Sequence, residues 1–345
     1  MKTPEPGKRV TISDIAAKAG VSIGAVSFAL NGRKGVSEKT RARVLKVADE
    51  LGWAPTSAAR TLAGGGTETV GLVLARDPHN LGVESFYMQF LAGLELELSQ
   101  RSFSLMLQVV PDTAAEIETL NRWRSARRVD GVLLVDLALD DPRVELSSRP
   151  GALPAVVVGD PSVAGGLTSV WTDDAASMAS AVAHLYALGH RRIGHVSGLA
   201  PLAHTHIRDE AFLREMDRLG GDALVLRTDY TMDSGAAATR AALMSPEPPT
   251  ALIYDNDVMS VAGLSVATDM GRSVPEDLSI IAWDDSLLCR HTIPRLTALS
   301  HDVVGFGSHV ARRLLGVLNG EPPAAFLDST PQLIVRDSTR SMRTL

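Results

Sequence analysis

Polar side chains that directly follow apolar, strand-like runs are the best candidates for chemistry in this chain. They are carboxylates and one amide at the ends of four runs: Asp160, Asp173, Asp174, Asp255, Asn256, Asp257, Asp284 and Asp285. Arg208 lies at the start of a predicted helix, just after the run RIGHVSG. Taken singly, an Asp or Asn after a strand commonly caps the next helix. Taken together, the placement favours a polar cleft that binds a small ligand, and carboxylates in such a cleft are also able to do acid–base work.

The elements that must position these groups are strands alternating with helices from Val70 onward. A first series of apolar runs spans residues 70–75, 104–110, 130–136 and 155–160. A second series spans residues 169–173, 192–198, 223–228, 251–255 and 278–285. Continuous apolar runs separated by helices indicate parallel strands that are buried on both faces. We therefore expect two doubly wound lobes of similar size, with the polar residues at the carboxyl ends of the strands, where ligands bind in such sheets.

The N-terminal segment, residues 9–51, has a different pattern and predicts three short helices. Thr11, Ser22 and Ser37 are suited to cap the N-termini of these helices. Apolar residues recur with the helical period and predict a small core of Ile12, Ile15, Ala16, Ala19, Val21, Val26, Leu30, Val36, Val44, Leu45 and Ala48. Two short helices joined by a tight Ala-Gly-Val-Ser turn are typical of a helix-turn-helix, whose second helix enters the major groove of DNA.

Charge separates this head from the rest of the chain. Residues 1–66 hold eleven Lys and Arg against five Asp and Glu, a net charge of +6. The whole chain carries −6, so residues 67–345 carry −12. A small helical bundle that binds nothing would explain the helices but not this asymmetry. A basic head on an acidic body is typical of a DNA-binding protein.

The segment between the head and the first strand predicts a hinge. Residues 56–63 have the composition of a helix of about two turns, followed by three glycines at 64–66. A helix that short is marginal in isolation, so it should form only when something packs on it. The glycines predict a flexible joint.

Composition and motifs exclude several classes of protein. No apolar run approaches the ~18–20 residues needed to span a bilayer, and the N-terminus has no hydrophobic signal region, so we expect a cytoplasmic protein without a membrane partner. The single cysteine, Cys289, cannot form an internal disulfide. The chain lacks the G-x-S-x-G, G-x-x-x-x-G-K-S/T and H-E-x-x-H motifs, so we expect neither catalytic residues nor a cofactor. His204 and His206 lack matched Cys or carboxylate spacing, so no metal site is expected either.

These residues resemble the LacI/GalR (lactose-repressor/galactose-repressor) family of bacterial transcription regulators. The resemblance rests on TISDIAAKAGVS, AVSFALNG and GVSEKTRARVLKVADELGW in the head and on RTLAG in the hinge. It continues through ALGHRRIGHVSG, RDEAF, ALIYDND, VPEDLSIIAWDD and PRLTALSHD, and so covers close to the full chain. A periplasmic sugar-binding protein would share the two-lobed core but not the head.

The resemblance implies a multidomain fold: an all-α helix-turn-helix head and an α/β two-lobed core like that of periplasmic binding proteins, with two doubly wound parallel sheets. The head is expected at residues 1–55, the hinge helix and linker at 56–66, and the effector-binding and dimerisation core at 67–345. Within the core we expect lobe 1 at about 67–166 plus about 326–345, lobe 2 at about 167–300, and the crossover at about 296–325. The last strand, near QLIVRD, should return to lobe 1.

The resemblance also implies a function and the residues that perform it. The chain is expected to be a sequence-specific repressor that binds a near-palindromic double-stranded DNA operator as a homodimer. The family's DNA-contacting positions match here to Ser22, Ile23, Gly24, Ser27, Phe28, Asn31, Ser37, Thr40 and Arg41. Ile23, Gly24 and Phe28 fall where better-known members carry hydrogen-bonding side chains, so they offer a base only apolar or backbone contact. Taken without the family, Ile23 and Phe28 have a second interpretation as packing residues, but we favour the groove.

Leu62 matches the leucine that the family wedges into the minor groove at the centre of the operator. An apolar side chain inserted at a base step costs unstacking but kinks the DNA onto the protein. The alternative is that Leu62 packs on the hinge helix of the partner.

The resemblance places a small-molecule effector, expected to be a sugar, between the lobes of the core. Arg208, Asn256 and Asp284 match the family's effector-binding positions, and Asp160 is a weaker match. A guanidinium fork, an amide and a carboxylate suit the hydroxyl groups of a sugar. Trp283 is suited to stack on a sugar face or, alternatively, to be a buried strand aromatic. The lobe 1 side of the cleft matches the family less well.

Overall fold

The computed structural model describes residues 10–30, 32–53, 66–77, 82 and 84–342. The chain divides into two compact units, Met1–Thr67 and Glu68–Leu345. Asn31, the predicted hinge helix and Leu62 lie outside the described residues.

The first unit contains three helices, and the residues predicted as caps begin them. They are α1 (Ile12–Ala19), α2 (Ile23–Leu30) and α3 (Glu38–Glu50). The Asp14 carboxylate accepts hydrogen bonds from the backbone N–H and the hydroxyl of Thr11, at 2.8 and 2.7 Å. Ser22 Oγ and Ser37 Oγ each accept a backbone N–H from the first turn of their own helix, at 3.2 Å. These bonds satisfy groups that the first turn of a helix leaves without partners.

The apolar faces of these helices pack into one small core. Ile15, Val26 and Val44 are fully buried in it. The helical period places Leu45 there as well, but Leu45 is 47% exposed. Helix α3 packs through Val44 and Val47, and residue 45 lies about 100° further round the helix than residue 44. Helices α1 and α2 meet at a bend of 104°, within the ~90–120° range of a helix-turn-helix.

In the described part of the chain, no single helix is long and apolar enough to cross a bilayer. Helices α1 and α2 reach that length and composition only when joined as the bent pair.

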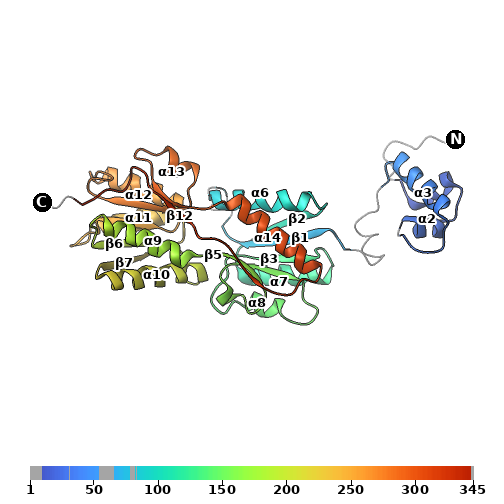
Figure 1. Ribbon diagram of the computed structural model, residues 1–345, viewed down its shortest axis with the longest axis horizontal. Helices are drawn as coiled ribbons and strands as arrows, with labels where there is room; N and C mark the ends of the chain where they lie inside the picture. The colour runs from blue at the N-terminus through green and yellow to red at the C-terminus, as the bar shows by residue number, and fades with distance from the viewer. Residues whose placement is uncertain (1–9, 31, 54–65, 78–81, 83, 343–345) are drawn as a thin grey trace. The chain divides into compact units, whose positions relative to one another are not determined.

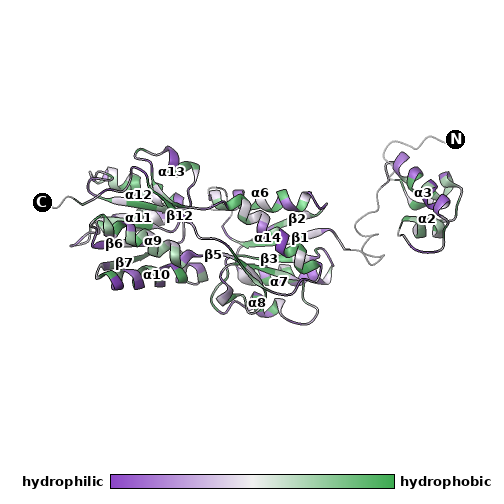
Figure 2. Cartoon of the chain, viewed as in Figure 1, coloured by the Kyte–Doolittle hydropathy of each residue, from purple (hydrophilic) through white to green (hydrophobic). Residues whose placement is uncertain are grey.

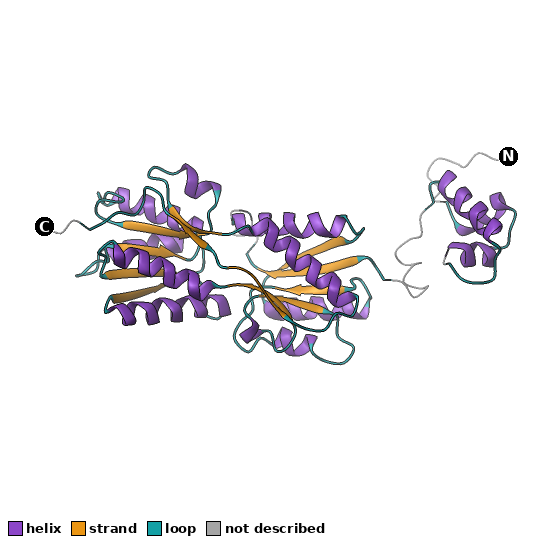
Figure 3. Ribbon diagram, in the orientation of Figure 1, coloured by secondary structure: helices purple, strands orange, loops and turns teal. Residues whose placement is uncertain are grey.

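The second unit is built from two six-stranded sheets with helices on both faces (Figures 1 and 3). The strand order is β11-β5-β4-β3-β1-β2 in lobe 1 and β12-β10-β9-β8-β6-β7 in lobe 2. The strands are β1 (Thr69–Ala75), β2 (Ser104–Val110), β3 (Gly131–Leu134), β4 (Ala155–Val158), β5 (Thr168–Thr172), β6 (Arg192–Ser197), β7 (Asp222–Arg227), β8 (Ala251–Tyr254), β9 (Ser279–Trp283), β10 (Thr297–Ser300), β11 (Ala325–Ser329) and β12 (Gln332–Ile334). The helices are α6 (Ser85–Ser99), α7 (Thr113–Ser125), α8 (Pro142–Ser147), the 3-10 turn η1 (Pro161–Val163), α9 (Asp174–Ala187), α10 (Ala203–Leu219), α11 (Met232–Leu243), α12 (Asp257–Asp269), α13 (Leu287–His291) and α14 (Val303–Leu318). In each sheet the second strand in chain order lies on one side of the first strand, β2 beside β1 and β7 beside β6. The third strand, β3 or β8, lies on the other side of the first, which is the doubly wound arrangement.

The central strands are continuous apolar runs because both faces of each sheet are covered. Leu72 and Val73 of β1 point to opposite faces of the sheet, and both are fully buried. Ile280 and Ile281 of β9 are fully buried in the same way. Figure 2 shows the strands of both lobes as mainly hydrophobic and the covering helices as mixed. This is the pattern from which the sequence predicts parallel sheets.

Two strand assignments expected from the sequence are wrong. The run at residues 169–173 was expected to begin lobe 2, but residues 169–172 belong to β5, which pairs with β4 in lobe 1. The QLIVRD strand, expected in lobe 1, forms β12, which pairs antiparallel with β10 in lobe 2. The strand that returns to lobe 1 is β11, which pairs with β5. Helix α14, expected within the crossover, packs against α6 of lobe 1.

The geometry of the crossings explains both errors. Only Asp173 separates β5 from α9, so the boundary between the lobes leaves no loop in the sequence. The carboxyl ends of the parallel strands face the space between the lobes in both sheets. The chain therefore leaves the carboxyl end of β11 in the space between the lobes. After residues 330–331 it enters lobe 2 from that same space. Strand β12 must then run opposite to its neighbours, and an antiparallel strand needs no crossover helix.

The two lobes also touch directly. The N–H of Ala203 donates to the carbonyl of Leu137 at 2.8 Å, and Ala138 forms an isolated bridge with Leu202. The Ser85 hydroxyl donates to Asp257 Oδ2 at 3.3 Å, from α6 of lobe 1 to α12 of lobe 2. The lobes are thus joined by hydrogen bonds as well as by the three crossings of the chain.

Candidate functional site

A cavity lies between the two lobes, at the carboxyl ends of strands from both sheets. Its empty space, including the part open to solvent, is about 1090 Å³. The charged and polar residues that line it include Arg76, Glu84, Asp136, Asp160, Thr172, Asp174, His204, Arg208, Asp255, Asn256, Asp257, Asp284 and His301. With Trp283, which also lines it, the cavity brings together all five residues that the sequence predicts for an effector.

Arg208 in α10 is held by two carboxylates and a ring. Its Nε donates to Asp174 Oδ2 at 2.8 Å, and its Nη1 lies 3.4 Å from Asp255 Oδ1. The guanidinium stacks on Trp283, with Cζ 3.7 Å from the ring. Burial alone would lower the pKa of Arg208, but the two carboxylates raise it above its ordinary value. The group is therefore charged and fixed, and none of its hydrogen bonds to described residues uses Nη2, which remains for a ligand.

Asp284 follows β9 with an unusual backbone conformation. Its φ is +67°, in the left-handed region that residues other than glycine rarely adopt. Burial, opposed by Arg208 and reinforced by nearby Asp257, raises the pKa of its carboxyl to about 7. Asp136 and Tyr230, also on the cavity wall, have φ of +50° and +70°. Strained backbone at three lining residues is typical of ligand sites, where the surrounding structure holds it in place.

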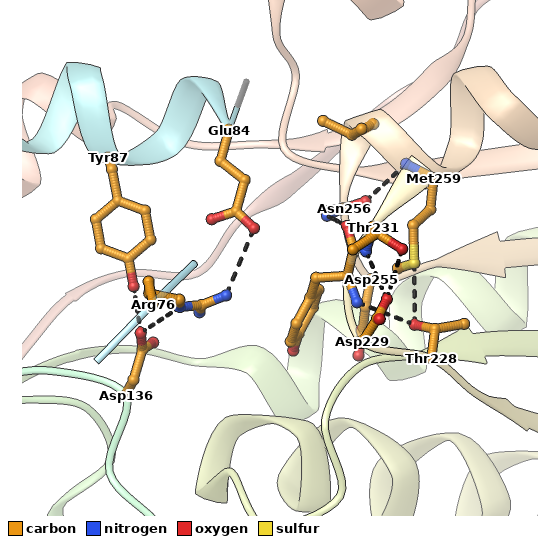
Figure 4. Close-up of polar contacts among 12 residues, drawn as sticks. Arg76, Glu84, Tyr87, Asp136, Thr228, Asp229, Thr231, Asp255, Asn256 and Met259 are labelled. Atoms are coloured by element: carbon orange, nitrogen blue, oxygen red, sulfur yellow. Dashed lines mark hydrogen bonds and ion pairs between the residues drawn. The ribbon is translucent and has the colours of Figure 1, made fainter. Parts of the chain in front are cut away.

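A second charged cluster forms part of the lobe 1 wall (Figure 4). Arg76 Nε donates to Asp136 Oδ2 at 2.9 Å, and Arg76 Nη1 lies 3.5 Å from Glu84 Oε1. The Tyr87 hydroxyl donates to the same oxygen of Asp136. Burial would raise the pKa of Asp136, but Arg76 and the Tyr87 hydrogen bond hold it below its ordinary value. For Glu84, burial outweighs Arg76 and raises the pKa to about 7.

Tyr230 connects the two walls of the cavity. Arg76 Cζ of lobe 1 lies 5.3 Å from the centre of its ring, and its hydroxyl lies 2.9 Å from His204 Nε2. Gly198 makes room for the ring, because a Cβ there would lie 1.9 Å from Tyr230 Cζ. His204 thus supports Tyr230.

The described residues contain no group of three or more His, Cys, Asp or Glu arranged to hold a metal ion.

Two of the predicted ligand residues use their side chains as helix caps. Asn256 Oδ1 accepts the N–H of Met259 at 2.8 Å, and its Nδ2 donates to the carbonyl of Tyr230 at 3.0 Å. Asp160 Oδ1 accepts the N–H of Ser162 at 2.9 Å. The capping role that the sequence left open is therefore present for both. Both the oxygen and the nitrogen of the Asn256 amide are hydrogen-bonded within the protein. Asn256 therefore shapes the cavity wall more than it offers hydrogen-bonding groups to a ligand.

Of the two alternatives for Trp283, the structure favours the buried aromatic. Trp283 is 2% exposed, and Arg208 stacks on its ring. Trp171 of β5 lines the same cavity and is only partly buried, so it is the tryptophan placed to stack on a ligand. The candidates from the sequence are polar residues that follow a strand, so Trp171, an aromatic residue inside β5, is missed.

Among the other lining residues, Glu84, Tyr230 and His301 are not candidates from the sequence, whereas Asp174 and Asp257 are expected in the polar cleft without being assigned to the effector. A signal existed for Asp174 and Asp257, which follow predicted strands. None existed for Glu84, which precedes α6 and reaches the cavity only through the packing of the two lobes. His301 lies just after β10, in the second crossing between the lobes.

The raised carboxyl pKa values predict how stability depends on pH. The folded protein binds protons more tightly at Asp284 and Glu84 than the unfolded chain does, so it holds more protons between about pH 4 and pH 7. The free energy of unfolding should therefore fall as pH rises through this range. Asp284→Asn should reduce the fall between pH 5 and pH 8 by about 1–3 kcal/mol, measured by urea denaturation.

Asp269→Asn is the matched control for this measurement. Asp269 is an exposed carboxylate at the end of α12, in the same lobe as Asp284. The Asp269→Asn variant should show the same change in the free energy of unfolding with pH as the parent protein. If the parent protein and the Asp284→Asn variant lose the same amount of stability between these two pH values, that result would contradict the burial of the Asp284 carboxyl.

The head presents the described members of its predicted DNA-binding set at the surface. Those that are exposed or half-buried are Ser22, Ile23, Gly24, Ser27, Phe28, Ser37, Thr40 and Arg41. Ile23 and Phe28 are 56% and 40% exposed, which disfavours their alternative interpretation as packing residues. Arg41 Nη2 donates to the carbonyl of Arg33 at 2.9 Å and so ties α3 to the segment that follows α2.

Known proteins share both units of this chain. Residues 11–56 match the family described as bacterial regulatory proteins, lacI family, and residues 182–339 match the periplasmic binding protein-like domain. The HTH-type transcriptional regulator CelR of Thermobifida fusca is 33% identical over 97% of this chain and 99% of its own length. The chain belongs to the LacI family.

Two solved structures of the LacI type align over nearly the whole chain. The lac repressor dimer bound to operator and the anti-inducer ONPF has a TM-score of 0.83 at 25% identity, covering 97% of this chain and 100% of that chain. The complex of the transcriptional regulator CelR with cellobiose has a TM-score of 0.73 at 32% identity, covering 96% and 100%. This LacI-family chain is therefore a helix-turn-helix transcriptional regulator with a two-lobed core.

Proposed function

We propose that the protein represses transcription by binding an operator through its head, and that a sugar bound in the interlobe cavity changes this binding. The observation that carries the proposal is the guanidinium of Arg208, fixed by Asp174 and Trp283 in a cavity formed by both lobes. A fixed, charged donor beside carboxylate acceptors suits sugar hydroxyls, which both donate and accept hydrogen bonds. The cavity and the head belong to separate units, so a ligand bound in one unit would change the DNA binding of the other.

The lining of the cavity supports a sugar as the class of effector. Glu84 and Asp284 supply acceptors, Arg76 and Arg208 supply donors, and Trp171 supplies an apolar face. Sugars combine hydroxyl groups with an apolar ring face, so they match such a mixed lining. The related CelR structure holds cellobiose.

Contacts between the lobes support a switch that depends on their arrangement. A ligand shifts an equilibrium between conformations only through its different affinity for each of them. A sugar that touches both walls would stabilise the arrangement in which Ser85 contacts Asp257 and Ala203 contacts Leu137. Other arrangements of the lobes would lose those contacts and part of the ligand's hydrogen bonds.

We also propose that the protein binds a near-palindromic operator as a homodimer. One helix-turn-helix per chain reads one half-site, so two chains related by a two-fold axis match a palindrome. The related lac repressor structure is a dimer bound to operator. The hydroxyls and guanidinium of Ser22, Ser37, Thr40 and Arg41 would hold phosphates. The roles of Asn31, of the hinge at 56–66 and of Leu62 as a wedge are proposed from the family resemblance.

The protein is proposed to act in the cytoplasm, without a membrane partner and without catalysis. The related proteins CelR and the lac repressor are named as regulators of transcription. The alternative is that Glu84 and Asp284, with pKa values raised to about 7, do acid–base work on the bound sugar. Chromatography of the sugar after incubation distinguishes the two, because a regulator returns it unchanged.

Selection of bound duplexes from a random pool by the full-length protein should return a sequence with two-fold symmetry. Two chains should occupy it, and affinity should fall steeply with salt because residues 1–66 carry a net charge of +6. Sugars added one at a time to this complex should include one that changes operator affinity by about 5- to 150-fold. Fluorescence anisotropy and footprinting measure both effects. Protection of one isolated half-site by a single chain would contradict the dimer.

A further inference from the structure

Helix α2 presents an apolar surface where a DNA-reading helix usually presents hydrogen-bonding groups. At about 100° per residue, Ile23, Ser27, Gly24 and Phe28 follow one another round an arc of about 140°. Val26 and Ala29 lie on the opposite side of the helix and are buried in the head. On the described part of the exposed arc, the only side-chain polar group is the Ser27 hydroxyl. The reading surface of this helix therefore consists mainly of an aliphatic and an aromatic side chain.

Phe28 is held at this surface by the backbone of Gly35. A Cβ at residue 35 would lie 2.9 Å from Phe28 Cδ2, so the ring rests directly against this glycine. Gly35 also has φ of +130°, which disfavours any larger residue there. One side of the ring is thus fixed, while the side chain as a whole stays 40% exposed. A fixed, half-exposed ring is suited to pack against a defined apolar group.

The major groove of DNA contains one such group. Thymine carries a C5-methyl group at the groove edge, whereas cytosine, adenine and guanine present hydrogen-bond donors and acceptors. Ile23 and Phe28 gain free energy by burying that methyl, and they cannot pair with the polar edges of the other bases. Gly24 lets the helix approach closely, because it places no side chain between Ser27 and Phe28.

We propose that the head reads thymine methyl groups in each operator half-site through Ile23 and Phe28. The inference rests on the proposed binding of an operator and names what the head recognises there. The exposed basic residues Arg33 and Lys34, which follow α2, and Lys39, in the first turn of α3, supply attraction to phosphates without sequence preference. The methyl contacts would then supply the selectivity.

Uracil tests the proposal without changing the protein. Deoxyuridine pairs like thymidine and lacks only the methyl group, so its substitution in the selected duplex removes apolar contact and keeps every hydrogen-bonding group. Substitution at the contacted positions should lower the affinity of the full-length protein about fourfold for each methyl, from the free energy of burying one such group. Uracil outside the half-sites is the control and should have no effect.

Variants of the head assign the effect to its side chains. Ile23→Ala and Phe28→Ala should each bind the thymine and uracil duplexes with more nearly equal affinity, because the side chain that senses the methyl is gone. Leu45→Ala is the matched control, since Leu45 is also exposed and apolar but lies on α3. That variant should keep the full difference between thymine and uracil.

The outcomes separate this inference from the proposed function. Loss of affinity on uracil substitution within the half-sites, abolished by Phe28→Ala or Ile23→Ala, supports methyl reading. Tight, sequence-specific binding that is unchanged by uracil at every half-site position overturns the inference and leaves the proposed function intact. Failure to enrich any sequence from the random pool overturns operator binding, and the inference with it.

Discussion

Arg208→Ala should weaken effector binding about 30- to 900-fold, the equivalent of ~2–4 kcal/mol, while the effector-free protein still binds its operator. The guanidinium is fixed by Asp174, Asp255 and Trp283 at the cavity wall, so its loss removes a charged donor that a ligand meets without further ordering. The head is a separate unit and keeps its own contacts. Calorimetric titration with the sugar found by screening, together with operator binding by anisotropy, measures both properties.

Arg208→Lys separates the shape of the side chain from its charge. An ammonium keeps the charge between Asp174 and Asp255 but cannot reproduce the planar fork or its stacking on Trp283. It should therefore preserve folding better than Arg208→Ala and still bind the effector poorly. Circular dichroism of both variants confirms that folded protein is compared. Normal effector affinity in a folded Arg208→Ala protein would show that the sugar binds elsewhere.

Arg143→Met should lower the free energy of unfolding of the core by about 3–5 kcal/mol, because it leaves two buried carboxylates without their charged partner. Arg143 Nη1 donates to both oxygens of Glu116 at 2.8 Å, and its Nε and Nη2 donate to Asp141 at 2.9 and 2.6 Å. The side chains of Arg143, Glu116 and Asp141 are 3%, 1% and 1% exposed. The same guanidinium donates to the carbonyls of Val135 and Asp136 at 3.0 Å, so its loss should also loosen the cavity wall.

Arg149→Met is the matched control for this prediction. Arg143 lies within α8, and Arg149 follows the same helix. Arg149 Nη2 is 2.7 Å from Glu145 Oε1. Their side chains are 59% and 74% exposed, so this pair should contribute only ~0–1 kcal/mol. Urea denaturation of both variants gives the comparison. Equal losses of stability would mean that the Arg143 network is hydrated in solution and does not behave as a buried one.

Periodicity was enough to predict most of the strands, but it missed β10 and β11 and could not assign every strand to a lobe. The strands around Leu72 and Ile280 are buried on both faces, so their apolar runs were visible in the sequence. The caps at Ser22 and Ser37 were visible because capping is local. Whether β5 pairs with β4 or begins the next lobe depends on contacts distant in the sequence, which periodicity does not report.

The candidate site was predictable where a residue follows a strand and not where tertiary packing brings it in. Asp284 and Asp160 follow strands and reach the cavity as predicted. Trp171 was missed because it lies inside a strand, and Glu84 reaches the cavity from a helix start that has no sequence signal. The burial of Trp283 under Arg208 was also beyond the sequence, because the two residues are 75 positions apart and meet only in the folded core.

The positions of β11 and β12 have a consequence for synthesis of the chain on the ribosome. Each is the outermost strand of its sheet, beside β5 in lobe 1 and β10 in lobe 2, and both are translated after the other strands that the structure describes. Until they emerge, the largely buried strands β5 and β10 form the edges of the two sheets, and their unpaired backbone groups are sites for unwanted pairing with other nascent chains. A polypeptide that stops short of residue 325 leaves both lobes incomplete, whereas the head, translated first, already has all three of its helices.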